Sequence, residues 1–312
     1  GQKKDAMSNE TIGIIGAGQI GAGVAQVAAQ AGVKVILNDV SEQLCLNGLK
    51  GLERNLDRMI QRGRFKPEER DRVIRRIETS ARLEDLREAE FVIEAVVENE
   101  EAKIGLFQRL DQICPPHVIF ASNTSSISIT RMGARTSRAD RFIGMHFMNP
   151  VPAMKLVEII RGLATSQDTY EATRGLATSR ETYEATRALA ERLGKNTMTA
   201  EDFPGFIVNR ILLPMINEAI YTMYEGVGGV TDIDTAMKLG TNQPMGPLEL
   251  ADLIGLDTCL AIMEVMHRVF GDDKYRACPL LKKYVDAGYL GRKAGRGFYT
   301  YDERGNPIPP VR

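Results

Sequence analysis

The sequence predicts an α/β protein with a doubly wound, mostly parallel sheet, followed by a second, all-helical domain. Apolar, β-branched runs alternate with helical periods up to about residue 160, and helical spacing alone continues beyond about residue 200. A chain of 312 residues is also long enough for two domains. We place the first domain at 11–200 and the second at 201–312.

A glycine-rich turn follows the first apolar run, residues 12–15, and opens a helix over 22–31. It reads Gly16-Ala17-Gly18-Gln19-Ile20-Gly21. This strand–turn–helix order is the context that a Rossmann-type dinucleotide fingerprint requires. Its glycines permit the tight turn, the approach of the backbone to a pyrophosphate and the close packing of helix on strand. The free N–H groups of the helix N-terminus then bind the phosphates.

An acidic residue completes this fingerprint. The second apolar run, 33–38, stops at Asp39, about 20 residues after Gly18, where a carboxylate binds the adenosine ribose. Neither Val40 nor Ser41 offers a cation for a 2′-phosphate, so we expect NAD rather than NADP. A glycine-rich loop that binds nothing is the alternative, and the register of strand, helix and acid argues against it.

The remaining elements follow from periodicity and from helix-breaking residues. Helices are expected over 41–62, 67–78 and 100–113. Strands are expected over 91–95, 118–121, 141–147 and 155–160. In the second domain, helical spacing covers 206–225, 231–239, 247–269 and 279–287, and 199–204 is the expected junction.

One segment is duplicated. Residues 162–174 are repeated at once as 175–187, with two differences between the copies. Two copies are too few for a solenoid. The second copy continues into 188–193 without a breaker, so we expect it to form the packed helix. The first copy, about 161–174, is expected to be an inserted, solvent-exposed segment, which surface loops tolerate at small cost.

Composition argues against several classes of protein. A formal net charge of −1 gives no general attraction to nucleic acid or to a membrane surface, and no run approaches 18 apolar residues. The four cysteines are scattered, which indicates neither a metal site nor a disulfide framework. Because residues 1–6 lack targeting features, we expect a cytoplasmic protein. A mitochondrial matrix protein whose transit peptide has been removed is the alternative.

His146 is the strongest candidate for acid–base chemistry. It lies near the carboxyl end of the 141–147 strand, where ligands gather in open α/β sheets. If this strand pairs antiparallel with 155–160 about Pro152, His146 faces Glu158, which can fix the imidazole tautomer and stabilise the imidazolium. A cross-strand polar pair without chemistry is the alternative. The other histidines are expected at an exposed turn and in helix packing, at His117 and His267.

Three further groups are weaker candidates. The polar loop 122–126, which includes Ser125, follows a strand end, and Asn209 opens the first long helix of the second domain. A basic stripe recurs every four residues on the helix 41–62, at Lys50, Arg54, Arg58 and Arg62. Such a stripe can hold the phosphates of a coenzyme A tail. The alternative is a solvated face, which we favour for Arg58.

Taken in order, these motifs resemble the 3-hydroxyacyl-CoA dehydrogenase family, in its short stand-alone form, the 3-hydroxybutyryl-CoA dehydrogenases. The matching stretches besides the glycine-rich turn are 94–99, 120–126, 146–152, 204–210, 232–240, 244–247 and 295–299. They extend over nearly the whole chain. The duplication is a departure, because the family pattern has one copy.

The resemblance implies the reversible oxidation of an (S)-3-hydroxyacyl-CoA to the 3-ketoacyl-CoA by NAD, in fatty-acid and butanoate metabolism. It implies His146 as the acid/base, Glu158 as its partner, and Ser125 and Asn209 near the substrate's C3 oxygen. The cofactor contacts it implies are Asp39, Glu98, Lys103, Ser125, Asn149 and, less directly, Lys293. It also implies coenzyme A contacts near Asn55 and Arg62, although mitochondrial relatives have a serine where Asn55 stands.

Two other functions are compatible with this fold. A non-catalytic NAD-binding protein would share it, and the joint presence of His146, Glu158, Ser125 and Asn209 argues against that function. A dehydrogenase of a free hydroxy acid or sugar acid is the second alternative, against which the basic stripe and the 244–247 loop favour a CoA thioester. A homodimer is also expected, since the second domain is rich in apolar residues, among them Leu212, Met215, Ile216, Ile220, Met223, Leu253 and Ile262.

Overall fold

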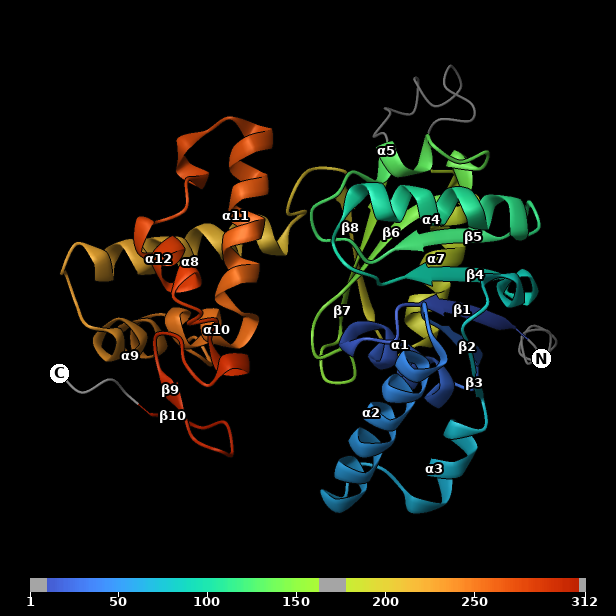
Figure 1. Cartoon of the computed structure of the whole chain (residues 1–312), viewed down its shortest axis with the longest axis horizontal. Coiled ribbons are helices and arrows are strands. Elements are labelled where there is room, and N and C mark those ends of the chain that lie inside the picture. The colour runs from blue at the N-terminus through green and yellow to red at the C-terminus, as the bar shows by residue number, and fades with distance from the viewer. Residues whose placement is uncertain (1–9, 163–177, 309–312) are drawn as a thin grey trace. The chain divides into compact units, whose positions relative to one another are not determined.

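The computed structural model describes residues 10–162 and 178–308, and Figure 1 shows their helices and strands. The chain divides into two compact units, residues 1–203 and 204–312. This division lies a few residues beyond the boundary placed at residue 200. Residues 163–177 hold nearly all of the first duplicated copy, so the prediction made for that copy lies outside the described residues.

An eight-stranded sheet forms the first unit. Its order is β3-β2-β1-β4-β5-β6-β7-β8, and all neighbours are parallel except the antiparallel pair β6–β7. The strands are β1 Thr11–Ile15, β2 Lys34–Asn38, β3 Ile77–Ser80, β4 Phe91–Glu94, β5 Ile119–Ser122, β6 Phe142–Phe147, β7 Leu156–Arg161 and β8 Asn196–Glu201. The strand order reverses between β1 and β4, which confirms the doubly wound, mostly parallel class.

Helices cover both faces of this sheet. They are α1 Gln19–Gln30, α2 Glu42–Gln61, α3 Pro67–Ile74, α4 Glu100–Ile113, α5 Ile129–Gly133 and α7 Arg180–Arg192, with 3₁₀ turns at Leu83–Glu88 and Ala139–Arg141. Helices α1 and α7 bury residues in one common core. On the opposite face Phe107 of α4 packs on Phe120 and Phe142, with ring centroids 5.7 and 4.6 Å apart. Helix α7 contains most of the second duplicated copy and packs on β7 and β8, as expected.

Three expectations for the elements are wrong, wholly or in part. The helix expected over 67–78 ends at Ile74, and residues 77–80 form β3 instead. The junction expected over 199–204 contains the division between the two units, but its first residues belong to β8, which was not expected. Both missed strands are edge strands with few buried side chains, so they lack the apolar runs by which strands are found. The helix expected over 247–269 is two helices, because Gly255 has a φ of +103°.

The second unit surrounds its own apolar core. Its helices are α8 Val208–Tyr224, α9 Val230–Gly240, α10 Pro247–Ile254, α11 Leu256–Phe270 and α12 Pro279–Asp286, with 3₁₀ turns at Asp273–Tyr275 and Arg292–Ala294. It is helical as expected, apart from a short hairpin in which β9 Thr300–Tyr301 pairs with β10 Pro307–Ile308. None of the described helices is both long and apolar enough to span a membrane.

Two of the three fingerprint glycines are required by packing. Gly16 has a φ of +99°, and a Cβ on Gly21 would lie 1.7 Å from the carbonyl oxygen of Gly16. A Cβ on Gly18 would meet nothing within 4 Å. The turn therefore needs Gly16 and Gly21 in order to fold, whereas Gly18 borders open space at the N-terminus of α1.

Gly21→Ala should lower the free energy of unfolding by about 3 kcal/mol, because its methyl group would clash with backbone that has little freedom to move. Gly18→Ala is the matched control and should change it by less than about 1 kcal/mol. Urea denaturation followed by circular dichroism measures both. Equal losses in the two variants would contradict this account of the turn.

Candidate active site

The antiparallel register of β6 and β7 places His146 opposite Glu158, as predicted. The Nδ1 atom of His146 lies 2.8 Å from Oε2 of Glu158. Glu158 is fully buried, and His146 is 7% exposed. Because an ionised carboxylate only accepts hydrogen bonds, Nδ1 carries a hydrogen and Nε2 is the basic nitrogen of the neutral ring. This geometry can orient an imidazole and stabilise its protonated form.

Glu98 anchors the polar loop that carries Ser125. Its Oε1 accepts hydrogen bonds from the Thr124 hydroxyl at 2.5 Å and from the backbone amides of Ser125 and Ser126 at 3.0 and 3.2 Å. The Ser125 hydroxyl takes no part in this anchoring. Burial alone would raise the pKa of Glu98, but nearby Lys103 and these donors together hold the pKa below its ordinary value.

A buried ion pair that was not expected from the sequence lies beside this loop. Glu94, at the end of β4, and Lys103, on α4, are 0% and 1% exposed. The Lys103 Nζ lies 2.5 Å from Glu94 Oε1 and 3.2 Å from Glu98 Oε2. The Ser122 hydroxyl donates to Glu94 Oε2 at 2.6 Å. The sequence signals for Glu94 are an acidic residue at the end of an otherwise apolar strand and its place in the family-like stretch 94–99.

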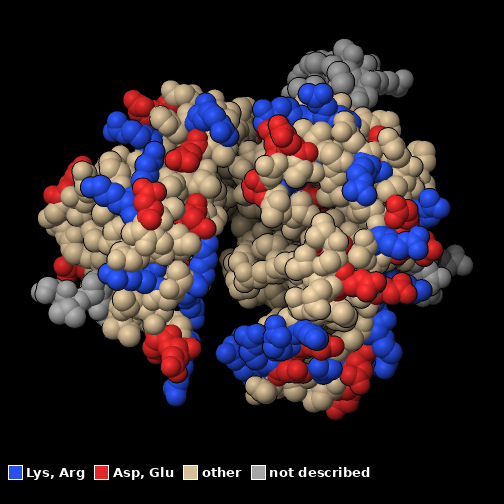
Figure 2. All heavy atoms as spheres, in the orientation of Figure 1, with Lys and Arg blue, Asp and Glu red and all other residues tan. Residues whose placement is uncertain are grey.

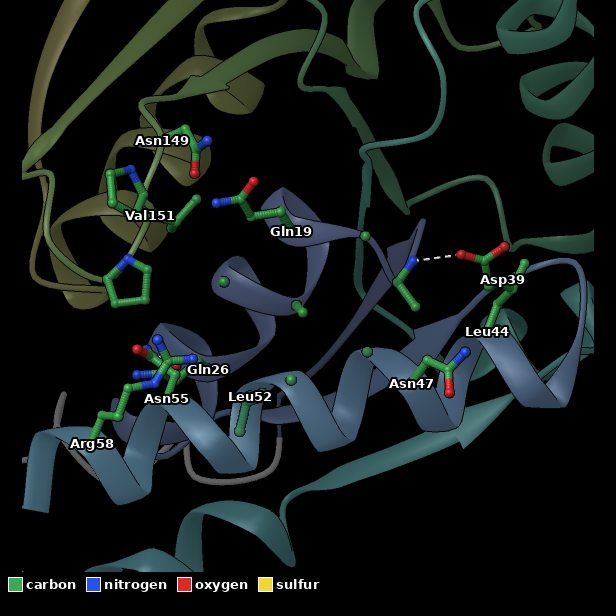
Figure 3. A pocket seen from close by; sticks show the side chains of 18 residues that line it. Gln19, Gln26, Asp39, Leu44, Asn47, Leu52, Asn55, Arg58, Asn149 and Val151 are labelled. Carbon is green, nitrogen blue, oxygen red and sulfur yellow. Dashed lines mark hydrogen bonds between the residues drawn. The ribbon is translucent and has the colours of Figure 1, made fainter. Parts of the chain in front are cut away.

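The glycine-rich turn and Asp39 fit a dinucleotide. The Asp39 carboxylate accepts hydrogen bonds from the amides of Ala17 and Val40, both at 2.7 Å, and Figure 3 shows the first of these bonds. They hold the carboxylate beside the turn. Open space at Gly18, above a helix N-terminus, suits a pyrophosphate, and a fixed carboxylate suits ribose hydroxyls.

A pocket of about 730 Å³ extends from this turn along α1 and α2 (Figure 3). Asn149 lies in its wall, in the loop that follows β6. Asn55 and Arg58 line the pocket from α2, and Asn55 Nδ2 donates to Gln26 Oε1 at 2.7 Å. Of the basic stripe, Arg58 lines the pocket, although a solvated face was the favoured expectation for it. The other three members are not in the lining: Lys50, Arg54 and Arg62.

The remaining candidates belong to other environments. Asn209 is half-buried in the first turn of α8, and Lys293 Nζ pairs with Asp257 at 2.6 Å. His117 is exposed, and His267 pairs with Asp273 at 3.2 Å, so neither histidine joins the His146 pair. In the described part of the chain, all four cysteines are buried thiols and no cluster of His, Cys, Asp or Glu could hold a metal.

Comparison with known proteins decides the family. The NAD binding domain of 3-hydroxyacyl-CoA dehydrogenase matches residues 11–180, and the C-terminal domain of the same enzymes matches 205–301. This chain belongs to the 3-hydroxyacyl-CoA dehydrogenase family. The match confirms the family resemblance seen in the sequence, and with it an oxidoreductase that uses NAD.

Individual relatives are similar over nearly their whole length. A probable 3-hydroxybutyryl-CoA dehydrogenase of Bacillus subtilis is 55% identical over 298 residues, which cover 96% of this chain and 99% of that protein. A 3-hydroxybutyryl-CoA dehydrogenase of Bradyrhizobium diazoefficiens is 54% identical, with 96% and 97% covered. The crystal structure of (S)-3-hydroxybutyryl-CoA dehydrogenase from Ralstonia eutropha matches with a TM-score of 0.86 and 47% identity, covering 95% of this chain and all of that one.

Glu98→Gln should change how stability depends on pH. The pKa of Glu98 is lower in the folded protein than its ordinary value of 4.5. Its carboxylate therefore stabilises the fold above about pH 4.5, and this contribution is lost as the pH falls through the folded pKa. The urea midpoint of the variant should lie below that of wild type at pH 7, and the gap should narrow below about pH 4.5. The control is Glu101→Gln, an exposed position in the first turn of α4, which should follow wild type; a constant gap for Glu98→Gln would contradict the prediction.

Proposed function

We propose that the protein catalyses the reversible, NAD-dependent oxidation of (S)-3-hydroxybutyryl-CoA, or of another short (S)-3-hydroxyacyl-CoA, to the 3-ketoacyl-CoA. The observation that supports this best is the buried His146–Glu158 pair, which lies in the same unit as the dinucleotide turn. The names of the relatives point to the substrate. Fatty-acid and butanoate metabolism are the pathways in which such a reaction belongs.

His146 acts as the acid/base in this proposal. During oxidation its Nε2 takes the proton of the C3 hydroxyl, since Nδ1 is engaged by Glu158. During reduction the same nitrogen returns a proton to the C3 oxygen. NAD, when bound, supplies the hydride acceptor. A general base of this kind contributes about 10²–10⁴-fold to the rate.

Other polar residues are assigned to binding. Ser125 and Asn209 are proposed to hydrogen-bond the C3 oxygen. Asp39 is proposed to bind the adenosine ribose, with Glu98 and Asn149 toward the nicotinamide end. Lys293 is the weakest of the cofactor assignments, because its ammonium already pairs with Asp257.

The coenzyme A part of the substrate is proposed to bind along the α1–α2 pocket. Arg58 lines this pocket beside Asn55, whose amide is fixed by Gln26 (Figure 3). Lysines and arginines gather on the surface over α2 (Figure 2). A guanidinium is suited to binding phosphate, and the surrounding positive charge attracts an anionic substrate.

The decisive experiment compares NADH oxidation with acetoacetyl-CoA and with free acetoacetate. We expect rapid turnover of the thioester and little of the free acid. Equal kcat/KM values would favour a dehydrogenase of free hydroxy acids. NADH binding without turnover of either compound would favour a non-catalytic NAD-binding protein.

His146→Gln should lower kcat several-hundredfold, because the proton then has no acceptor of suitable basicity. NADH binding, followed by fluorescence, should stay near the wild-type value. Glu158→Gln should lower kcat less, since the imidazole keeps a hydrogen-bond partner but loses the charge that stabilises its protonated form. Activity of the His146 variant within tenfold of wild type would refute the assignment.

Arg58→Gln should raise the KM for acetoacetyl-CoA about tenfold, as expected for the loss of a charged hydrogen bond. The KM for NADH should change less than twofold. Arg54→Gln is the matched control, because Arg54 lies one turn away on the same helix but outside the pocket lining. If both substitutions raise the KM for acetoacetyl-CoA equally, the stripe attracts the substrate only as a diffuse positive surface.

A homodimer formed through the second unit is also proposed. Part of the sequence argument for it is wrong, because Ile216, Ile220 and Ile262 are buried in the core of that unit. The support comes instead from exposed apolar side chains of the same unit, among them Ile211, Val227, Leu239 and Leu253. Light scattering at micromolar concentration should show a dimer, and a stable monomer would contradict this.

We further propose a cytoplasmic location, which four unpaired thiols favour.

A further inference from the structure

The ammonium group of Lys103 is enclosed by three acceptors. Its Nζ lies 2.5 Å from Glu94 Oε1, 3.2 Å from Glu98 Oε2 and 3.4 Å from the carbonyl oxygen of Val96. An ammonium has three N–H donors, so these contacts use all of them. The side chain is also 1% exposed. A direct cofactor contact, which the family resemblance implies for Lys103, would require one of these bonds to break.

Glu94 is fixed to the sheet on the other side of this ammonium. Ser122 is its register partner across β4 and β5, and the Ser122 hydroxyl donates to Glu94 Oε2 at 2.6 Å. The backbone amide of Val96 donates to Oε1 at 2.7 Å. One carboxylate oxygen is therefore held by β5 and the other by the backbone just after β4, and Lys103 is held by Glu94.

Glu98 connects this ion pair to the loop after β5. One carboxylate oxygen contacts Lys103, while the other accepts hydrogen bonds from the Ser125 and Ser126 amides and the Thr124 hydroxyl. Loops are mobile unless they are tied down. A shift of about 1 Å in a reacting geometry can cost about 10²-fold in rate.

We propose that Glu94 and Lys103 are positioning residues, which hold Glu98 and through it the Ser125 loop in the geometry that the reaction needs. The proposal rests on the function proposed above, in which Ser125 binds the C3 oxygen. It assigns Lys103 to the support of that loop rather than to the cofactor. The two assignments differ in which measurement should change when the buried ion pair is broken.

The test is a double-mutant cycle with Glu94→Gln and Ser125→Ala, assayed with acetoacetyl-CoA and NADH. Glu94→Gln alone should lower kcat at least tenfold and change the Kd for NADH less than threefold. In the Ser125→Ala background it should lower kcat less than twofold, because Glu94 acts through Ser125. If Glu94→Gln lowers kcat by the same factor in the wild-type and the Ser125→Ala backgrounds, the proposal is overturned. A raised Kd for NADH with unchanged kcat would assign Lys103 to the cofactor.

Asp111→Asn is the structural control. Asp111 pairs with Arg138 at 2.6 Å, and Arg138 also bonds the carbonyls of Pro115 and Val118 just before β5, at the opposite edge of the sheet. Asp111→Asn should change kcat by the same factor in the wild-type and the Ser125→Ala backgrounds. If Glu94→Gln fails to fold, Ser122→Ala keeps the ion pair and should give a smaller loss that likewise vanishes in the Ser125→Ala background.

Amide hydrogen exchange separates this proposal from the proposed function. Glu94→Gln should speed exchange at the Ser125 and Ser126 amides at least tenfold, and Asp111→Asn should leave both unchanged. This readout needs no substrate. Faster exchange in a protein that does not turn over acetoacetyl-CoA would sustain the structural support of the loop while refuting the proposed function. Unchanged exchange would overturn the positioning role.

Discussion

The antiparallel pairing of β6 with β7 is the constraint on which the candidate active site depends. Strands β1–β6 run parallel, and the chain reverses between β6 and β7, which returns Glu158 to the level of His146. A slip of one residue would turn Glu158 to the other face of the sheet. Lys195 supports the connecting turn, because its Nζ donates to the carbonyls of Val151 and Met154 at 2.5 and 2.8 Å. The hydrogen bond between imidazole and carboxylate is thus a consequence of strand register.

The negative charges of three carboxylates in this unit are stabilised by three different kinds of partner. The kind of partner decides which role each carboxylate can take. Glu94 is neutralised by a buried lysine, which makes it a structural support. Glu158 is paired with an imidazole, a group that can both accept and donate a proton. Asp39 accepts hydrogen bonds from two backbone amides beside a pocket, where it can still accept hydrogen bonds from ribose hydroxyls. A buried charge without such compensation would destabilise the fold.

The sequence predicted those parts of the site that follow from local geometry. The glycine-rich turn is contiguous, and a reversal about Pro152 is enough to bring His146 and Glu158 together. The partners of Glu94 could not be predicted in this way, because Lys103 and Ser122 come from a helix and a strand that meet it only in the folded sheet. The sequence also could not show which residue of the basic stripe borders the pocket, which in the structure is Arg58. Residues four apart on a helix differ by about 40° in direction, and only the packing of α2 on α1 decides which of them borders the pocket.

The packing of α2 also links the two ends of that pocket. A Cβ on Gly48 would lie 2.5 Å from the carbonyl oxygen of Ala17, so α2 rests directly on the glycine-rich turn. Arg58 lies ten residues further along the same helix, which is about 15 Å at 1.5 Å per residue. Because one helix sets both the depth of the pocket at the turn and the place of the guanidinium, a side chain at Gly48 would displace both together. The spacing between the glycine-rich turn and the Arg58 guanidinium is therefore a property of a single rigid element. A substitution at Gly48, in the first half of α2, would affect the far end of the pocket as well as the near end.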